Sequence, residues 1–223
     1  MRRKRTLEVG SGHRPHPSAD VLLDRYLEPV EREGPLARDR PLVVGDAHRL
    51  PFGDLSFHKV LARQVLEHAE DPVAFVQEMG RVAPSVLIET PSPLTEAMFR
   101  VRTFHRWCVA RDAHTLIVWP IEMVQKSAYH GELFESLYER NAFVYLLVRS
   151  RPDVFLTVWD GAAPPVRRGT QQELANTIEC LHQQLCEGSR AAQLTRVHAA
   201  IRGIGEARLE EITVRIRKRF RRR

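Results

Sequence analysis

The sequence predicts an α/β protein built on a doubly wound, mostly parallel sheet. Five short apolar runs recur in the first 90 residues, at 6–9, 20–23, 41–44, 59–62 and 85–89. They are rich in Val, Leu and Ile and alternate little with polar residues, which is typical of parallel strands covered on both faces. Polar or helical stretches separate them, so we expect crossover connections between parallel strands.

The connections between these runs predict one regular helix and two shortened crossovers. Residues 71–82 favour a helix, because Asp71 can cap it, Pro72 suits its first turn and four apolar side chains share one face. Residues 10–19 are too few for a normal crossover helix, and prolines and a glycine interrupt residues 25–40. We therefore expect one side of the sheet to be thinly covered, unless later segments cover it.

The second half of the chain predicts antiparallel strands at the edge of the sheet. Residues 105–120 favour a hairpin, and residues 131–141 are helix-like. Two apolar runs, at 142–150 and 153–161, are expected to form an antiparallel pair that extends the sheet.

The end of the chain predicts a helical extension. A stretch rich in proline and glycine at 161–169 is the candidate linker, and helical patterns follow it, the last of them basic and amphipathic. We therefore expect an α/β domain over residues 1–162 and a helical extension with a basic C-terminal tail over residues 163–223.

The net charge of +6 is concentrated at the two ends of the chain. Residues 2–5 and 215–223 are strongly basic, and the sequence between them is mildly acidic. Such a tail can lie in solvent or contact an anionic membrane. Because only one aromatic residue, Phe220, stands among its charges, recognition of nucleic acid is not expected.

Cysteine usage and hydropathy indicate a reduced, cytoplasmic setting, with peripheral membrane contact through the tail as the alternative. The three cysteines form no Cys-x-x-Cys pair, so we predict neither a metal site nor a disulfide framework. No apolar run approaches the roughly 18 residues of a membrane span. The basic start of the chain is followed by a run too short and too polar for an export signal. The sequence indicates no oligomeric state.

The stretch "LEVGSG" predicts a nucleoside-binding loop at the end of the first strand. Glu8, Gly10 and Gly12 form an acid-x-Gly-x-Gly series, in which glycine lets the backbone approach a ligand closely. Asp24 ends the second run, where a carboxylate can accept hydrogen bonds from ribose hydroxyls. The third glycine of a dinucleotide fingerprint is missing and no helix N-terminus follows, which argues against NAD or FAD.

The stretch "GDAHRLPFGDLSFHKVLARQVLEHAEDP", residues 45–72, resembles the class I S-adenosylmethionine-dependent methyltransferases, in the type 11-like subgroup that includes the quinone-biosynthesis enzymes. The family pattern is G-D-A-x-x-L-P-F-x-D-x-S-F-D-x-V, four variable residues, then V-L-E-H-x-x-D-P. The resemblance covers residues 6–93 and, more loosely, continues to about 160. It implies a Rossmann-like fold and S-adenosyl-L-methionine as the cofactor.

The resemblance also implies roles for single residues. Glu8, Gly10 and Gly12 would surround the methionine and ribose portions of the cofactor, and Asp24 would hold the ribose hydroxyls. Asp46 and Ala47 would meet the adenine. Arg63 and Gln64 would line the methionine end of the cofactor.

Two departures from the family pattern bear on activity. His58 replaces the acid of the Ser-Phe-Asp step, which mostly supports a loop in this family. The short first crossover removes the helix whose N-terminus normally faces the cofactor's carboxylate, for which Arg14, Arg63 or His13 can substitute electrostatically.

A general base is needed only if the acceptor must lose a proton. His68 is the preferred candidate because it follows the cofactor-facing turn, and His105 and His130 are weaker candidates. Two functions remain open at this stage. One is methyl transfer to a small-molecule, lipid or glycan-type acceptor, and the other is a catalytically weak, methyltransferase-like binding or scaffold protein whose basic tail contacts a membrane or partner.

Overall fold

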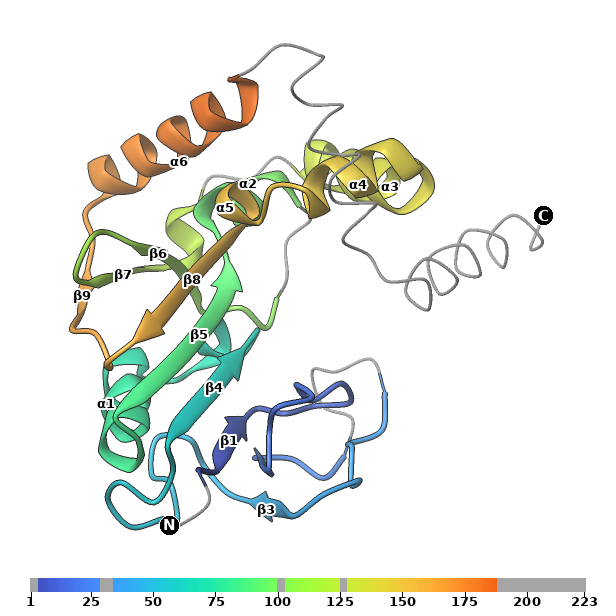
Figure 1. Ribbon diagram of the computed structural model, residues 1–223. Coiled ribbons are helices and arrows are strands. Elements are labelled where there is room, and N and C mark those ends of the chain that lie inside the picture. The colour runs from blue at the N-terminus through green and yellow to red at the C-terminus, as the bar shows by residue number, and fades with distance from the viewer. Residues whose placement is uncertain (1–3, 29–33, 100–102, 125–127, 188–223) are drawn as a thin grey trace, which may run out of the picture.

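The main sheet has six strands in the order β3-β2-β1-β4-β5-β8 (Figure 1). The computed structural model describes residues 4–28, 34–99, 103–124 and 128–187. Every neighbouring pair is parallel except β5 and β8, which are antiparallel. The strands are β1 (Thr6–Val9), β2 (Val21–Asp24), β3 (Leu42–Val44), β4 (Lys59–Arg63), β5 (Ser85–Pro91) and β8 (Leu156–Gly161).

The first five strands confirm the predicted fold class. Each lies within two residues of the apolar run that predicts it. The chain winds from β1 outward through β2 to β3, then returns to place β4 and β5 on the other side of β1. This reversal between β1 and β4 is the switch point at which open α/β sheets bind ligands, beyond the carboxyl ends of the strands.

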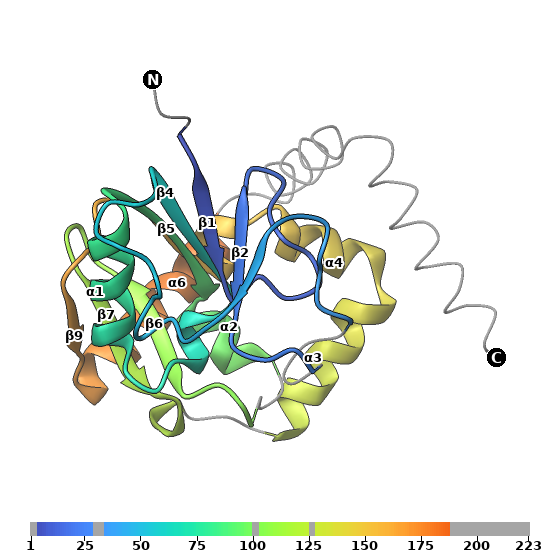
Figure 2. The same cartoon turned by 90° about the horizontal axis from the view of Figure 1, so that it is seen from below.

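The helix α1 (Pro72–Val82) joins β4 to β5 and agrees with its predicted cap. Asp71 Oδ1 accepts hydrogen bonds from the backbone N–H groups of Val73 and Ala74 at 2.9 and 3.1 Å. The helix buries Phe75, Val76, Met79 and Val82 against the sheet, within the main hydrophobic core. Figure 2 shows α1 and the second sheet gathered on one side of the main strands.

The other side of the main sheet has connections without regular helices. No helix occurs between β1 and β2 or between β3 and β4, and none occurs in the described residues between β2 and β3. The shortened first crossover is thus confirmed, and the second has no helix in its described residues. Leu22 and Leu61 face this side and are nevertheless almost fully buried, so it is not left bare. Arg40 braces the first connection by donating hydrogen bonds to the carbonyls of His16 and Ala19 at 3.2 and 2.7 Å.

A second sheet, in the order β6-β7-β9, packs beside α1. The predicted hairpin is confirmed as β6 (Trp107–Arg111) and β7 (Leu116–Pro120). The candidate linker contains a strand that the sequence did not predict, β9 (Val166–Arg168), which pairs in parallel with β7. A three-residue strand of this kind depends on its partner, so its own composition gives little signal.

The predicted antiparallel pair at 142–150 and 153–161 was wrong in its first member. The first run forms the helix α4 (Ala142–Arg149), and β8 pairs instead with β5. Asn141 begins α4, because its side-chain oxygen accepts a hydrogen bond from Val144 N at 3.2 Å. An apolar run of this length fits a strand or a helix equally well, and the cap decides between them.

The remaining elements surround the carboxyl end of the sheet. The predicted helix at 131–141 is confirmed as part of α3. Helix α6 begins with a capping box between Thr170 and Glu173, and Leu174 is buried against β6 and β7. The division of the chain at residue 162 stays a prediction. These elements are η1 (Leu66–His68), α2 (Pro93–Met98), η2 (Ile121–Met123), α3 (Ala128–Arg140), α5 (Pro152–Phe155) and α6 (Gln171–Cys186).

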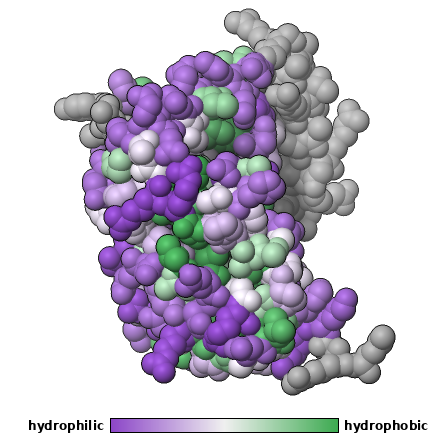
Figure 3. Space-filling model, turned by 90° about the vertical axis from the view of Figure 1, so that its left-hand side faces the viewer, coloured by the Kyte–Doolittle hydropathy of each residue, from purple (hydrophilic) through white to green (hydrophobic). Residues whose placement is uncertain are grey.

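The predicted basic tail and the helical patterns beyond α6 lie outside the described residues. Within the described part, no helix is both long and apolar enough to cross a membrane. The face that carries α1, β9 and α6 in Figure 1 shows apolar residues only as small patches among hydrophilic ones (Figure 3).

Candidate functional site

A pocket of about 510 Å³ lies beyond the carboxyl ends of β1, β2, β3 and β4. This volume falls within the range of about 300–1,000 Å³ that is typical of small-ligand sites. All nine residues that the sequence analysis assigned to the site line this pocket. They are Glu8, Gly10, Gly12, Asp24, Asp46, Ala47, Arg63, Gln64 and His68.

The loop after β1 needs both of its glycines, for different reasons. Gly10 and Gly12 have φ angles of 60° and 56°, in the left-handed region that favours glycine. A Cβ atom at Gly10 would collide with the side chain of Val65, whereas a Cβ atom at Gly12 would meet only the carbonyl of Gly10, at 4.0 Å. The loop therefore turns sharply and packs directly on the end of β4.

Glu8 fixes this loop from beneath. Its side chain is only 2% exposed, and both carboxylate oxygens have partners. One oxygen accepts a hydrogen bond from the backbone N–H of His16 at 2.5 Å, and the other accepts from Arg63 Nε at 3.1 Å. Arg63 also donates to the carbonyl of Arg14 at 3.0 Å. Glu8 and Arg63, each of which is predicted to contact the cofactor, thus also hold the loop in place.

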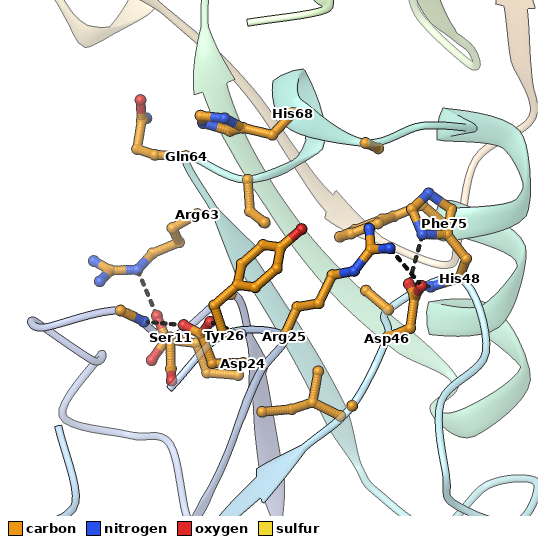
Figure 4. Close-up of a pocket in the computed structure, with 18 of the residues that line it drawn as sticks. Ser11, Asp24, Arg25, Tyr26, Asp46, His48, Arg63, Gln64, His68 and Phe75 are labelled. Atoms are coloured by element: carbon orange, nitrogen blue, oxygen red, sulfur yellow. Dashed lines mark hydrogen bonds and ion pairs between the residues drawn. The ribbon is translucent and has the colours of Figure 1, made fainter. Parts of the chain in front are cut away.

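Asp24 connects the ends of β1 and β2. Its carboxylate accepts hydrogen bonds from Gly12 N at 3.0 Å and from Tyr26 N at 3.1 Å. Figure 4 shows this carboxylate at the floor of the pocket, next to Ser11 and Arg63. The position agrees with the predicted role of Asp24, because a carboxylate has lone pairs for further donors.

Asp46, just after β3, is held ionised. Burial disfavours its charged form, but hydrogen bonds from the backbone and ring of His48 and the charge of Arg25 outweigh burial and lower the pKa of Asp46. His48 Nδ1 lies 2.6 Å from Asp46 Oδ1. The pocket therefore presents a fixed negative charge near Ala47, where the resemblance places adenine.

Arg25 and Tyr26 extend across the pocket from the end of β2 (Figure 4). Arg25 Nη1 donates to Glu70 Oε1 at 2.8 Å, and its other terminal nitrogen lies 3.8 Å from Asp46 Oδ2. The hydrogen bond to Glu70 raises the pKa of Arg25. The sequence analysis did not single out these residues, although Arg25 directly follows the predicted ribose-binding acid.

The loop after Asp46 is supported from α1. Arg81 donates hydrogen bonds to the carbonyls of Phe52 and Leu50 at 2.9 and 3.1 Å, and Glu78 accepts from Leu50 N at 2.8 Å. Leu50 is buried in the main core, and Phe52 packs against it. These residues therefore shape the loop and do not line the pocket.

The far end of the pocket is formed by the turn after β4. Gln64 has a φ angle of 56°, which is unusual for a residue other than glycine. Its backbone N–H donates to the carbonyl of Glu89 at 2.7 Å, which holds the turn against the end of β5. Non-glycine residues in this conformation cost of order 1–3 kcal/mol and cluster at functional sites.

His68 borders the pocket on one side and a buried cluster on the other. Its ring stacks on Phe104, with centroids 5.4 Å apart, and meets the ring of His105 edge-on at 4.9 Å. His105 Nδ1 in turn lies 2.6 Å from Glu96 Oε1. The structure thus brings together two of the three candidate histidines. His130, in α3, is exposed and does not line the pocket.

The lining of the pocket is rich in polar groups and fits a polar ligand. Ser11 is among the lining residues, and its Oγ atom is buried and has no hydrogen-bond partner in the part of the chain that the structure describes. A buried polar atom without a partner is costly, so such atoms usually meet a ligand or water. The carboxylates at the ends of β2 and β3 and the close backbone approach at Gly12 also fit S-adenosylmethionine.

Comparison with known proteins agrees with this geometry. A sequence model of the family described as "Methyltransferase domain" matches residues 20–85, from β2 to the start of β5. A search of curated proteins found no significant match.

Solved structures that match part of this chain include methyltransferases. A methyltransferase from Thermotoga maritima, described as a possible histamine N-methyltransferase, is 20% identical over 42% of this chain and 47% of its own, with a TM-score of 0.35. A chain from the complex of the Haloferax volcanii Trm112 methyltransferase activator with a methyltransferase candidate is 22% identical over 40% of this chain and 47% of its own, with a TM-score of 0.31.

The PH0226 protein of Pyrococcus horikoshii is 18% identical over 41% of this chain and 47% of its own, with a TM-score of 0.32. This chain thus spans about half the length of each of these three proteins. The match at residues 20–85 thus makes this part of the chain similar to the methyltransferase-domain family, and the strand order around it is that of a Rossmann-like α/β sheet.

Proposed function

We propose that this chain binds S-adenosyl-L-methionine and transfers its methyl group to a small-molecule, lipid or glycan-type acceptor. The observation that carries the proposal is the convergence of all nine sequence-assigned residues, from Glu8 to His68, on one pocket at the switch point of the sheet. Four different strand ends contribute to it. Such convergence of distant positions is what a built ligand site requires.

The assigned contacts follow the geometry of the strand ends. Asp24 accepts hydrogen bonds from the ribose hydroxyls, Asp46 and Ala47 face the adenine, and Gln64 borders the methionine end. The bound donor brings an activated sulfonium, so the protein's task is to align the acceptor with it and exclude water. His68 stands at the end of the pocket where an acceptor would enter, and its role as a base stays a prediction.

A specific observation favours the second candidate, a methyltransferase-like binding or scaffold protein. Both carboxylate oxygens of Glu8 already accept hydrogen bonds, from His16 N and Arg63 Nε, and the described crossovers on its side of the sheet contain no helix. Both features weaken the expected grip on the methionine end. Peripheral contact of the basic tail with an anionic membrane belongs to this second proposal. Loss of co-sedimentation with anionic vesicles on deleting residues 215–223 would support that contact.

Cofactor binding separates the two functions. S-adenosylhomocysteine at saturating concentration should raise the unfolding temperature, because a ligand that binds only the folded state stabilises it. Asp24→Asn should weaken binding about tenfold to a hundredfold, the effect of losing a hydrogen bond to a charged group. Asp39→Asn is the matched control, since Asp39 lies outside the pocket and its exposed pair with Arg40 contributes little. No stabilisation of the wild-type chain would exclude methyl transfer.

A further inference from the structure

Three metal-ligating side chains meet beside the acceptor end of the pocket. Glu67 and His68 come from η1, and His105 comes from the segment just before β6. Ligand atoms of the three lie within 4.8 Å of one another. Glu67 and His105 are buried, and His68 lines the pocket. The cluster is thus closed to solvent at Glu67 and His105 and borders the pocket at His68.

The two segments that supply these residues are tied together by their backbones. Arg106 N donates to the carbonyl of Glu67 at 2.7 Å, and Trp107 Nε1 donates to the carbonyl of Ala69 at 2.8 Å. The stacking of His68 on Phe104 restrains the imidazole further. A preorganised set of this kind loses little conformational entropy when it binds an ion.

His105 carries a feature typical of metal-binding histidines. Its Nδ1 atom lies 2.6 Å from Oε1 of Glu96, and both side chains are buried. A carboxylate at this nitrogen fixes the proton on Nδ1 and leaves Nε2 with a lone pair, as in carboxylate–histidine–zinc arrangements. Glu96 is therefore placed to orient His105.

The charges of the cluster also favour a cation. Glu67 and Glu96 are 1% and 3% exposed and stand on either side of His105 and His68. Two buried carboxylates are costly unless positive charge offsets them. A divalent cation held by this cluster would place positive charge beside both carboxylates.

We propose that Glu67, His68 and His105 bind a divalent transition-metal ion of the zinc type, with Glu96 as the residue that positions His105. Two imidazoles and one carboxylate suit such an ion, and three protein ligands leave a coordination position open. The open coordination position lies on the side of His68, the one of the three ligands that lines the pocket. It would take a hydroxyl or thiol acceptor, a use that rests on the proposed function, whereas ion binding itself does not. His68 is then a ligand and not a base while the ion is bound.

The sequence analysis predicted no metal site, because it looked for cysteine pairs. The distance in sequence between His68 and His105 hides the cluster, which only the packing of β6 beside η1 assembles. A second pair of ligand-type residues, His182 and Cys186, lies one turn apart on the exposed face of α6 and serves as the control.

Cobalt binding tests the proposal. Untagged full-length chain is treated with a chelator, then titrated with Co²⁺ while its visible absorption is recorded. We expect one Co²⁺ per chain with a visible absorption band, and we expect Zn²⁺ to displace the Co²⁺ and abolish the band. Glu67→Gln and His105→Ala should abolish the band, and Glu96→Gln should weaken binding about 10- to 100-fold. The double variant His182→Ala/Cys186→Ser should keep it.

Two results would overturn the proposal. One is the absence of stoichiometric absorption in the wild-type chain, which needs no variant and so does not depend on whether the variants fold. The other is a band that survives His105→Ala but disappears in the His182/Cys186 double variant. Circular dichroism monitors the fold of each variant. Because no S-adenosylhomocysteine is present, a failure here is distinct from a failure of the proposed function.

Discussion

Arg63 Nε donates a hydrogen bond to Glu8 Oε1 at 3.1 Å, so two residues assigned to the cofactor bind each other. Glu8 lies on β1 and Arg63 ends the adjacent strand β4, on the side of the sheet opposite α1. The side chain of Glu8 is 2% exposed and that of Arg63 28%. The pair therefore compensates a buried charge at the place where the loop after β1 turns into the pocket.

Breaking this pair should destabilise the fold. Arg63→Gln leaves the Glu8 carboxylate buried, with His16 N as its remaining donor among the described residues, and we expect the free energy of unfolding to fall by about 1–3 kcal/mol. Glu8→Gln/Arg63→Gln should cost less than the sum of the two single variants, because the residues interact directly. Urea unfolding of the four proteins measures this, and additive effects would contradict it.

The two glycines of the loop should respond differently to alanine. Gly10→Ala combines an unfavourable φ with a collision against Val65, and we expect a loss of about 2–4 kcal/mol in unfolding free energy. Gly12→Ala meets open space and should cost about 1 kcal/mol, from its φ angle alone.

A control and a rescue separate these causes. Gly53→Ala, whose Cβ would lie 3.6 Å from Ser56 Oγ, should change stability by less than about 0.5 kcal/mol. Adding Val65→Ala to Gly10→Ala removes the collision but not the strained φ. Equal thermal unfolding temperatures for Gly10→Ala and Gly12→Ala would show that the contact with Val65 is not restrictive.

The sequence predicts those parts of the molecule that local signals determine. The strands up to β5 follow from apolar runs, and α1 follows from its cap at Asp71 and its apolar face. The pocket follows as well, because parallel strands that end in glycine or acid bring those ends to one edge. Asp24 needed no more than its position after the second run, whereas Asp46 was assigned through the family resemblance.

Long-range partners determine the features that sequence reasoning missed. The helix α4 was taken for a strand because a short apolar run has no clear period, and β9 exists only through its pairing with β7. Arg25 binds Glu70 from a position 45 residues away. The cluster around His105 likewise requires the second sheet to pack beside η1.

Acid should loosen the loop that follows β3. Hydrogen bonds from Arg81 lower the pKa of Glu78 below the ordinary 4.5, against the effect of burial and with help from the backbone N–H of Leu50. A carboxyl whose folded-state pKa is depressed stabilises the fold above its unfolded value and loses this contribution as the pH falls toward the folded value. The stability due to Glu78 should therefore be complete above about pH 5 and decline below 4.5.

Chemical denaturation between pH 6 and pH 3 measures this contribution. Glu78→Gln should be less stable than the wild type at pH 6, and the difference should shrink as the pH falls through this range, because protonation removes the same interaction. Since Glu78 and Arg81 support the loop after Asp46, the variant should also bind S-adenosylhomocysteine more weakly at pH 7. A stability difference that does not change with pH would contradict the role of the carboxylate charge.

Gln64 allows its backbone conformation and its side chain to be tested separately. Its φ angle of 56° costs a non-glycine residue of order 1 kcal/mol. Gln64→Gly removes this strain, but it also raises the conformational entropy of the unfolded chain, which lowers the free energy of unfolding by a similar amount. We therefore expect the unfolding free energy of Gln64→Gly to stay within about 1 kcal/mol of the wild type. Gln64→Val, with a β-branched side chain in the same conformation, should lose about 1–3 kcal/mol of unfolding free energy.

If the side chain of Gln64 contacts the cofactor, Gln64→Gly should nevertheless bind S-adenosylhomocysteine several-fold more weakly in a calorimetric titration, because its fold is kept and only the amide is lost. Unchanged affinity in this variant would limit the role of Gln64 to the turn that holds β4 against β5.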